Sequence, residues 1–428
     1  MLNKESNKNE YQVSKEVKDT FDNLLSDTNI KTALEFIKAD HDHTLNEQKD
    51  ICAISAPTFQ EQKRAEDYLK RFTDLGLEDT RIDAIGNVLG FVSGSGNGPK
   101  LVVAAHLDTV FPEGTDTKVI EKDGIFHAPG IADDTRGLVE VLGIIRALKK
   151  SNVQPLGDIV FCGNVGEEGL GDLIGTKQLF SDHQDIDGFI SIDGTGVGSI
   201  TYLATGSHRY QVTFSCSGGH SYGNFGLPSA IHAAGRAISR IADLRPPKEP
   251  KTTFTVGTIK GGTSVNAIAA KAEMLIDIRS NGEEELLKLE AEILASIKAA
   301  ADEEKAHWNS DQVTFDIKLL GDRPAGSQSP EEPLVQAAYA AGKLLEINSQ
   351  LSSPGSTDAN IPISLGIPAI AIGRGGVSGE IHTKNEWFDP KDAFLGPQKA
   401  FLTILSLVGV NGVSTPLLKK SKVDGSKE

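Results

Sequence analysis

Short apolar runs alternate with helical patterns along most of the chain, and several of these runs end in acidic or imidazole side chains. Residues 101–105, LVVAA, lead directly into His106 and, after one spacer residue, Asp108. A continuous apolar run predicts a strand that is buried on both faces. In open α/β sheets ligands gather where such strands end. A histidine satisfied by a neighbouring aspartate is the simpler interpretation of this pair taken alone.

Two further apolar runs end in the same way. Residues 159–162 lead through a glycine-rich turn to the adjacent Glu167 and Glu168, and residues 189–192 end at Asp193. Adjacent carboxylates repel each other, so a positive group is expected near the glutamates. The structural alternative for the glutamates is a solvated charge pair.

The remaining acidic and imidazole residues precede a helix or follow a glycine loop. Asp133 and Asp134 stand directly before a helical pattern that begins near Thr135. Aspartate is among the best N-capping residues, which is the structural alternative for this pair. His382 follows the strand-like sequence PAIAIG and a glycine loop.

These motifs together supply two histidines and at least three carboxylates, without any thiolate. This donor set suits a pair of zinc-like ions. Two such ions, about 3.5–4 Å apart, would share one carboxylate and hold a water that attacks a carbonyl group, while a free carboxylate accepts its proton. One of the two adjacent glutamates suits that last role.

The motifs resemble those of the co-catalytic zinc peptidases and deacylases, a family that includes peptidase T, carboxypeptidase G, aminoacylase and succinyl-diaminopimelate desuccinylase. The resemblance extends from about Thr32 to Val410. It implies two Zn²⁺ ions per chain, with Co²⁺ or Mn²⁺ as possible substitutes, and a peptidase T-like aminopeptidase that hydrolyses short peptides. In the family, aspartate at the position of Asp193 is typical of peptidases and glutamate of many deacylases.

The resemblance also implies a role for each motif residue. Arg136 departs from the pattern, because relatives often carry lysine there. The implied roles are His106 and Asp193 on one metal, Glu168 and His382 on the other, Asp133 as the bridging ligand, Asp108 as the partner that orients His106, and Glu167 as the general base.

The pattern of elements predicts a discontinuous α/β catalytic domain with a mixed sheet, interrupted by an inserted α+β domain. The insert reads β-α-β-β-α-β, which is the order of a ferredoxin-like antiparallel sheet with helices on one face. In the family such an insert is a lid and commonly a dimer surface. The expected boundaries are 1–205 and 323–414 for the catalytic domain, 206–322 for the lid, and 415–428 for a flexible tail.

Three lid residues match family positions that contact the substrate or the transition state. Asn266 and Arg279 match substrate contacts, and the planar guanidinium of Arg279 suits a carboxylate. A structural ion pair is the alternative for Arg279. His220, set among glycines, matches a histidine that crosses a twofold interface and stabilises the oxyanion in the partner's site. A surface loop histidine is the alternative.

Other functions remain open on the sequence alone. An N-acyl amino acid amidohydrolase would use the same metal site. Residues 219–223 match G-x-S-x-G around Ser221, and Asp358 and His382 follow in the order of a serine hydrolase triad, although the helix starts too late for a nucleophile elbow. A protein that keeps the fold but has lost its chemistry, and acts only in binding, is the third alternative.

Composition and charge indicate the partners and the cell compartment to expect for this protein. A formal net charge of −16 argues against nucleic acid and anionic membrane partners. The first residues carry no apolar signal-peptide core, and Cys52, Cys162 and Cys216 are expected to be reduced, so a cytoplasmic enzyme is predicted. The first twenty residues and the end of the chain from Leu418 are expected to be frayed.

Overall fold

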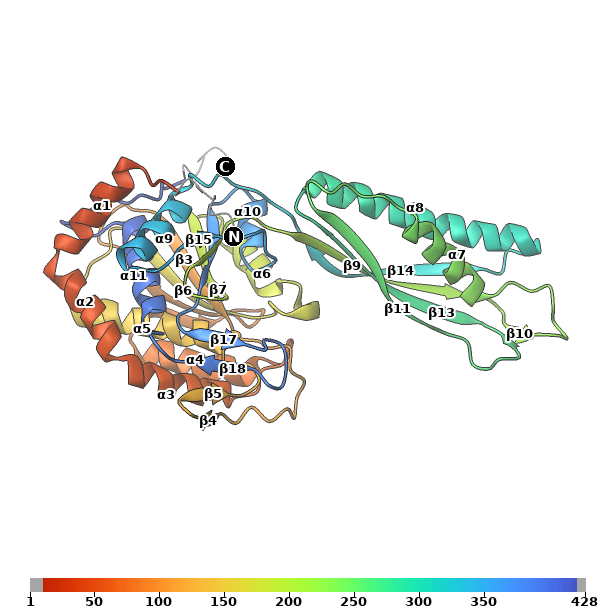
Figure 1. The fold of residues 1–428 in the computed structure, drawn as a ribbon, viewed down its shortest axis with the longest axis horizontal. Helices are drawn as coiled ribbons and strands as arrows, with labels where there is room; N and C mark the ends of the chain where they lie inside the picture. The colour runs from red at the N-terminus through yellow and green to blue at the C-terminus, as the bar shows by residue number, and fades with distance from the viewer. Residues whose placement is uncertain (1–10, 422–428) are drawn as a thin grey trace, which may run out of the picture.

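The computed structural model describes residues 11–421 and contains two domains (Figure 1). A broad α/β domain is built from the chain before and after an insert, which projects from it as an elongated arm. The chain enters the arm through β9 (Gly206–Ser215) and leaves it through β14 (Thr314–Arg323). We keep the name lid for this inserted domain.

The larger domain is organised around a mixed sheet, as predicted. Parallel pairing joins β3 to both β6 and β7, and β7 to β16, so the carboxyl ends of four strands meet at one edge. The eight strands lie in the order β1 (Glu78–Ile82), β2 (Val88–Val92), β6 (Asp158–Asn164), β3 (Lys100–His106), β7 (Gly188–Gly194), β16 (Ala369–Gly373), β8 (Ser199–Thr201) and β15 (Gln350–Leu351).

Helices cover both faces of this sheet, which explains why its central strands are apolar throughout. On β3, Leu101 and Val103 pack into the same core as α5 (Thr135–Ser151) and α11 (Leu395–Val408). Val102 and Ala104 of β3 face the opposite core, together with α6 (Ile174–Asp182) and α10 (Asn360–Ser364). Side chains alternate along a strand, so both registers of β3 are buried.

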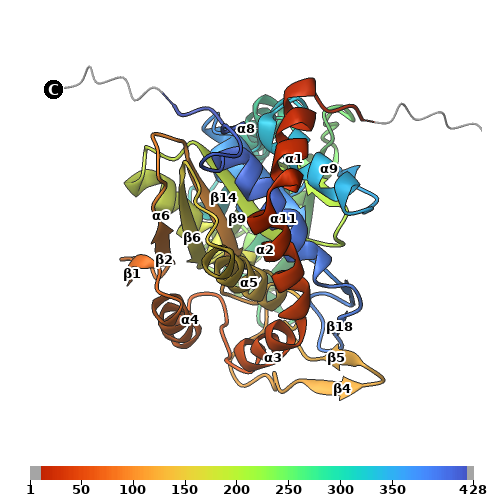
Figure 2. The same cartoon turned by 90° about the vertical axis from the view of Figure 1, so that its left-hand side faces the viewer.

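An outer layer of helices, α1 (Lys15–Ser26), α2 (Thr28–Ala39) and α3 (His41–Cys52), lies against α5, α11 and α9 (Pro333–Leu344) (Figure 2). The larger domain also contains α4 (Gln62–Asp74), the 3₁₀ turn η1 (Gly169–Gly171) and a second, four-stranded sheet. The strands of this sheet lie in the order β17 (Val377–Gly379), β18 (Trp387–Asp389), β5 (Ile125–His127) and β4 (Ile120–Lys122).

The lid has its own antiparallel sheet and hydrophobic core. Its strand order is β11-β13-β9-β14, the ferredoxin-like arrangement that the sequence predicted, with β11 (Thr252–Gly261) and β13 (Lys271–Ser280). Two helices, α7 (Ala230–Ala242) and α8 (Glu283–Trp308), pack on the buried face of the sheet. A two-stranded sheet of β10 (Gly219–His220) and β12 (Ala267–Ile268) lies at the far end of the lid (Figure 1).

The described ends of the chain are more ordered than expected. Residues 15–20 belong to α1, whose Phe21 and Leu24 are buried, so fraying of the first twenty residues is wrong for this part. Leu417 and Leu418 are buried, so the chain stays packed further than the expectation of a tail from residue 415. Residues 1–10 and 422–428 lie outside the described residues. Within residues 11–421, no helix is long and apolar enough to cross a membrane.

Candidate metal centre

The predicted ligands meet at the carboxyl edge of the central sheet. His106 is the last residue of β3, and Asp193 stands near the end of the neighbouring β7. Glu168 follows β6, and Asp133 lies in the turn before α5. His382 arrives from the loop between β17 and β18. Because the strands are parallel neighbours, residues far apart in the sequence come together.

Asp133 lies between the two histidines. Its Oδ1 is 3.2 Å from Nε2 of His106, and its Oδ2 is 3.1 Å from Nε2 of His382. His382 Nε2 is also 2.8 Å from Oε1 of Glu168, and His106 Nε2 is 3.7 Å from Oδ1 of Asp193. Asp133 thus places one oxygen beside each histidine, and each histidine lies near a second carboxylate, Asp193 for His106 and Glu168 for His382.

Asp108 connects His106 to the turn that carries Glu167 and Glu168. His106 Nδ1 lies 3.0 Å from the carbonyl oxygen of Asp108, which can only accept, so the hydrogen is on Nδ1 and Nε2 faces the acidic residues. The Asp108 carboxylate is fully buried and accepts from the backbone N–H groups of Glu167 and Glu168 and from the hydroxyl of Thr58. The nearer carboxylate oxygen of Asp108 is 3.6 Å from Nδ1 of His106, so the backbone carbonyl of Asp108 is its direct hydrogen-bond partner.

Glu167 is buried next to the donor cluster but contacts a cation instead. Its Oε1 is 3.3 Å from Nη1 of Arg323, the last residue of β14, and its carbonyl oxygen also accepts from Arg323. Burial raises the pKa of Glu167 well above its ordinary value, while the charge of Arg323 acts to lower it. Glu167 therefore has a different environment from Glu168, as a base that is not a ligand requires.

A second buried cation, Arg374, joins the acidic residues before α5. Its Nη1 is 3.0 Å from Oδ1 of Asp133 and 2.9 Å from Oδ1 of Asp134. Asp134 also caps α5 by accepting from the N–H of Gly137, the structural role that the sequence allowed for it. No motif in the sequence singled out Arg323, which ends β14, or Arg374, which directly follows β16, although polar residues at strand ends are a signal for both.

Arg136 is buried and forms an ion pair inside the larger domain. Its Nε is 2.8 Å from Oε1 of Glu140 within a buried pair, and Nη2 donates to the carbonyl oxygen of Ala393. The same Glu140 oxygen accepts from the N–H of Gly375, next to Arg374. This pair fixes the segment that carries Arg374, which gives Arg136 a structural role.

The donors fit divalent cations. Oxygen and imidazole donors without thiolates suit zinc, cobalt or manganese. Ligand atoms of His106, Asp133 and Glu168 lie within 4.8 Å of one another, and so do those of His106, Asp134 and Asp193. Hydrogen bonds from His382 to Asp133 and Glu168 raise the pKa of His382 to about 10, so these carboxylates attract positive charge strongly.

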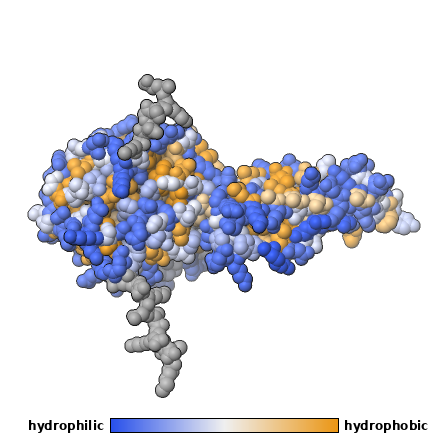
Figure 3. All heavy atoms as spheres, turned by 90° about the horizontal axis from the view of Figure 1, so that it is seen from above, coloured by the Kyte–Doolittle hydropathy of each residue, from blue (hydrophilic) through white to orange (hydrophobic). Residues whose placement is uncertain are grey.

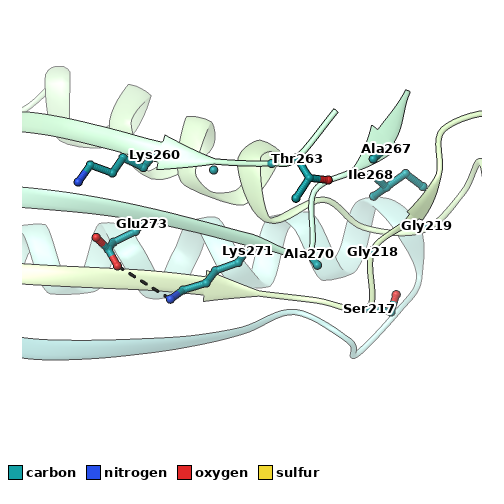
Figure 4. A pocket seen from close by; sticks show the side chains of 12 residues that line it. Ser217, Gly218, Gly219, Lys260, Thr263, Ala267, Ile268, Ala270, Lys271 and Glu273 are labelled. Carbon is teal, nitrogen blue, oxygen red and sulfur yellow. Dashed lines mark ion pairs between the residues drawn. The ribbon is translucent and has the colours of Figure 1, made fainter. Parts of the chain in front are cut away.

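The donor cluster lines a pocket of 410 Å³ between the two domains. Glu167, Glu168 and His382 form part of one wall, and Arg209 and Arg279 of the lid form part of another. A larger hollow of 480 Å³ at the far end of the lid is lined mostly by glycines and small residues, with Lys260, Lys271 and Glu273 as its charged groups (Figure 4). We place the chemistry in the smaller pocket, because the metal-ligand types gather only there among these two.

A known protein family matches most of this chain. Residues 102–405 match the model of peptidase family M20/M25/M40. The chain belongs to this family. The matched range contains all five predicted metal ligands, Glu167 and the three lid residues singled out in the sequence.

Individual M20 relatives are similar to this chain over different lengths. Carboxypeptidase G2 of a Pseudomonas strain is 27% identical over 222 residues, which cover 48% of this chain and only 51% of that protein. The structure of aminopeptidase PepT from Bacillus cereus has a TM-score of 0.70 at 25% identity and covers 85% of this chain and 98% of its own. A Staphylococcus aureus tripeptidase has a TM-score of 0.71 at 25% identity, with 85% and 97% covered.

The lid candidates of this M20 member occupy two separate places. Arg279 lines the pocket with the metal-ligand residues, and its Nε is 2.8 Å from Oδ2 of Asp277. His220 lies in β10 and Asn266 directly before β12, and both are exposed; the backbone carbonyl of Asn266 accepts from the N–H of Ser221. Figure 1 shows β10 at the far end of the lid. Within one chain, neither lines the pocket.

The serine hydrolase alternative is not supported by this arrangement. Ser221 lies at the far end of the lid, whereas His382 contacts Asp133 and Glu168 in the larger domain. Asp358 is buried and accepts from Thr176 and from Nδ2 of Asn164. The three residues of the supposed triad therefore do not come together in one chain.

Proposed function

We propose that this protein is a dinuclear metal-dependent exopeptidase that acts on short peptides, as a peptidase T-like aminopeptidase. The observation that carries the proposal is the position of Asp133, whose two oxygens each approach one histidine. A carboxylate placed in this way would suit two divalent cations bound close together. In this proposal His106 and Asp193 would hold one Zn²⁺, and Glu168 and His382 would hold the other.

The proposed mechanism assigns each nearby residue a distinct task. Bound divalent cations would polarise the substrate carbonyl and lower the pKa of a water molecule. Glu167 accepts the proton of the attacking water and passes it to the leaving amine. Asp108 keeps Nε2 of His106 directed toward Asp133, where a metal would bind, and fixes the turn that carries Glu167. Arg323 holds Glu167 at the pocket wall.

A homodimer through the lid would bring His220 and Asn266 to a second active site. Strand β13, Lys271–Ser280, separates the far end of the lid from Arg279, and ten residues at about 3.3 Å each span roughly 30 Å. A short peptide cannot bridge this distance, so His220 acts on the partner's substrate. Large side chains near the far end of the lid, including Tyr222 and Val265, are exposed and favour such a contact. Hydrophobic patches are also visible on the surface of the lid in Figure 3. We place the enzyme in the cytoplasm.

Hydrolysis of N-acyl amino acids is the second candidate function. The partial similarity to carboxypeptidase G2 and the arginines on the lid side of the pocket favour it, because an acylated amino acid presents a free carboxylate. The same metal site would cleave either kind of amide bond.

Metal analysis and a substrate panel test the proposal. We expect about two zinc-type ions per chain in protein purified without chelator. Activity should be highest on di- and tripeptides, with N-acylated amino acids as the comparison. Preference for N-acylated amino acids would favour the second function. No bound metal after zinc supplementation, and no hydrolysis of either group, would leave only the binding-protein alternative.

A further inference from the structure

The lid meets the larger domain at a group of charged side chains around His208. His208 lies on β9, where the chain enters the lid, and stands directly opposite Asp322 of β14, where the chain leaves it. The residue after Asp322 is Arg323, which contacts Glu167. We propose that the charged ring of His208 is a positioning residue, which holds the end of β14 so that Arg323 keeps Glu167 in place. This role rests on the proposed function and adds a pH dependence to the same site.

His208 is buried and has a carboxylate at each of its two ring nitrogens. Nδ1 is 3.0 Å from Oε1 of Glu290 on α8, and Nε2 is 3.1 Å from Oδ1 of Asp322. An ionised carboxylate only accepts hydrogen bonds, and a neutral imidazole carries a hydrogen on one nitrogen only. The arrangement therefore suits the charged ring, which has a hydrogen on each nitrogen.

The other neighbours of His208 supply no positive charge that would replace its own. Ile278 of β13, the residue opposite His208 on the other neighbouring strand, is apolar. Tyr210 of β9 donates its hydroxyl hydrogen to the same oxygen of Glu290. Burial acts to lower the pKa of His208, but the contacts with Asp322 and Glu290 raise it above its ordinary value. The ring therefore keeps its proton to a higher pH than a free histidine and loses it as the pH rises further.

The larger domain holds the same residue of β14 by its backbone. The N–H of Asp322 donates to Oδ1 of Asp172 over 2.7 Å, and the carbonyl oxygen of Asp322 accepts from Nζ of Lys177, also over 2.7 Å. Lys177 is in turn 2.6 Å from Oδ2 of Asp172, which directly follows η1. Asp172 and Lys177 thus fix the backbone of Asp322, while His208 fixes its side chain.

Arg323 reaches the pocket from the opposite side of β14, because successive residues of a strand alternate between its faces. Its Nη1 is 3.3 Å from Oε1 of Glu167 and 3.3 Å from Oγ of Ser356. When His208 loses its proton, two carboxylates face a neutral ring, and the attraction that holds Asp322 against the ring is lost. The end of β14 then shifts, and Arg323 no longer holds Glu167 in the same place.

A purely structural role is the competing explanation for His208, because removing one partner of a buried ion pair destabilises a protein in any case. Such a role lowers the melting temperature, and any effect on kcat is the same at every pH and independent of Arg323. The proposed role requires both the charge of the ring and Arg323. The pH dependence of kcat and a double substitution therefore separate the two explanations.

The experiment measures kcat for trialanine with zinc-loaded natural protein and His208→Gln between about pH 6 and about pH 9, on both sides of the ordinary pKa of histidine. The ratio of the two values at each pH cancels the titration of the metal site. We expect this ratio to reach up to ~10²-fold at the acid end, the cost of misplacing a catalytic group by about 1 Å, and to fall toward one as His208 loses its proton.

Two further variants complete the experiment. In Arg323→Gln protein, adding His208→Gln should cause no further loss, because the effect of His208 passes through Arg323. His232→Gln is the matched control and should leave kcat unchanged. This lid histidine also lies near a carboxylate, 3.6 Å from Oε1 of Glu304, but it stands on α7 and does not line the pocket.

A ratio that stays constant with pH, or an equal loss from His208→Gln in natural and Arg323→Gln protein, overturns the inference. If His208→Gln does not fold, Asp322→Asn keeps the backbone contacts of Asp322 and should move the fall in kcat to lower pH. The reason is that it removes one of the two carboxylates that favour the charged ring. An unchanged pH profile for Asp322→Asn overturns the inference as well.

NMR of the histidine ring signals follows the proton of His208 without any substrate, and Asp322→Asn should lower the pKa of the affected signal. A His208 ring that titrates at or below the ordinary pKa overturns the inference. If the natural protein hydrolyses no peptide, the proposed function is refuted. Hydrolysis with a ratio that does not change with pH refutes only the role of His208.

Discussion

Nη1 of Arg374 lies 3.0 Å from Oδ1 of Asp133, the carboxylate that also approaches both histidines. The same nitrogen is 2.9 Å from Oδ1 of Asp134, and Arg374, Asp133 and Asp134 are all buried. A fixed cation therefore neutralises part of the acidic cluster before any metal binds.

Replacing Arg374 with methionine should destabilise the metal-free protein strongly. Removing one partner of a buried ion pair typically costs about 3–5 kcal/mol, because the remaining charge is left uncompensated. Bound zinc supplies positive charge to the same carboxylates, so the loss should be smaller in the zinc-loaded protein. Thermal unfolding of both proteins with zinc and with chelator measures this. An equal loss in both conditions would show that Arg374 and the metals do not act on the same charges.

Substitutions at the neighbouring Glu167 and Glu168 should have different effects, the first on catalysis and the second on metal binding. Glu167→Ala should lower kcat by at least ~10²-fold, the lower end for a general base, and keep both metals. Glu168→Ala should lose metal from one site, because Glu168 contacts His382 whereas Glu167 contacts Arg323. Elemental analysis and steady-state kinetics on both variants check the assignment. Near-normal turnover by Glu167→Ala would refute its role as the base.

Metal uptake should release protons at neutral pH. Hydrogen bonds to Asp133 and Glu168 raise the pKa of His382 to about 10 in the metal-free protein, and carboxylate partners outweigh burial to raise the pKa of His106 as well. Both imidazoles are therefore protonated near pH 7 and must lose that proton to bind metal. Affinity for zinc should increase as the pH rises from 7 toward 10. Calorimetric titration in buffers of different ionisation enthalpy measures the release, and its absence contradicts these pKa directions.

His220 should act across a subunit interface. The inactive variants His220→Ala and Glu167→Ala are mixed and allowed to exchange subunits. If His220 serves the partner's site, one site of each mixed dimer combines an intact Glu167 with an intact His220, and activity returns. Loss of one oxyanion donor typically costs ~10²–10³ in kcat, so recovery is easily measured. Verified mixed dimers without recovery would assign His220 to its own subunit or to no catalytic role.

Lys399 should make stability depend on pH. Burial lowers the pKa of this α11 lysine to about 7, and its ammonium nitrogen donates to the carbonyl oxygens of Val197 and Ser199. Above about pH 7 the unfolded chain binds a proton that the folded lysine has lost, up to the ordinary value of about 10.4. The contribution of Lys399 to stability therefore increases across this window.

Lys399→Met removes that titration. The melting temperature of the natural protein should rise relative to that of the variant between about pH 7 and about pH 9.5. Neighbouring Thr403→Val, on the same helix, is the control, because its buried hydroxyl does not titrate. A difference between Lys399→Met and the natural protein that stays constant with pH would contradict the lowered pKa.

The sequence alone determined the residue types of the site and the strands that carry them. His106 and Asp193 stand at the ends of strands that are buried on both faces, and such strands appear as uninterrupted apolar runs. The order of elements in the lid also predicts its ferredoxin-like sheet, because helix and strand patterns differ in period.

Only the tertiary structure decided which charges meet. Arg209 and Arg323 lie on β9 and β14 and line the pocket, whereas Arg374 follows β16 and contacts Asp133; no local pattern shows that residues so distant in sequence meet around one site. The distance between His220 and Arg279 likewise follows from the length of β13 and the direction in which the lid projects (Figure 1). Periodicity reports whether a side chain is buried, whereas its ionic partners depend on which strands are neighbours in the folded sheet.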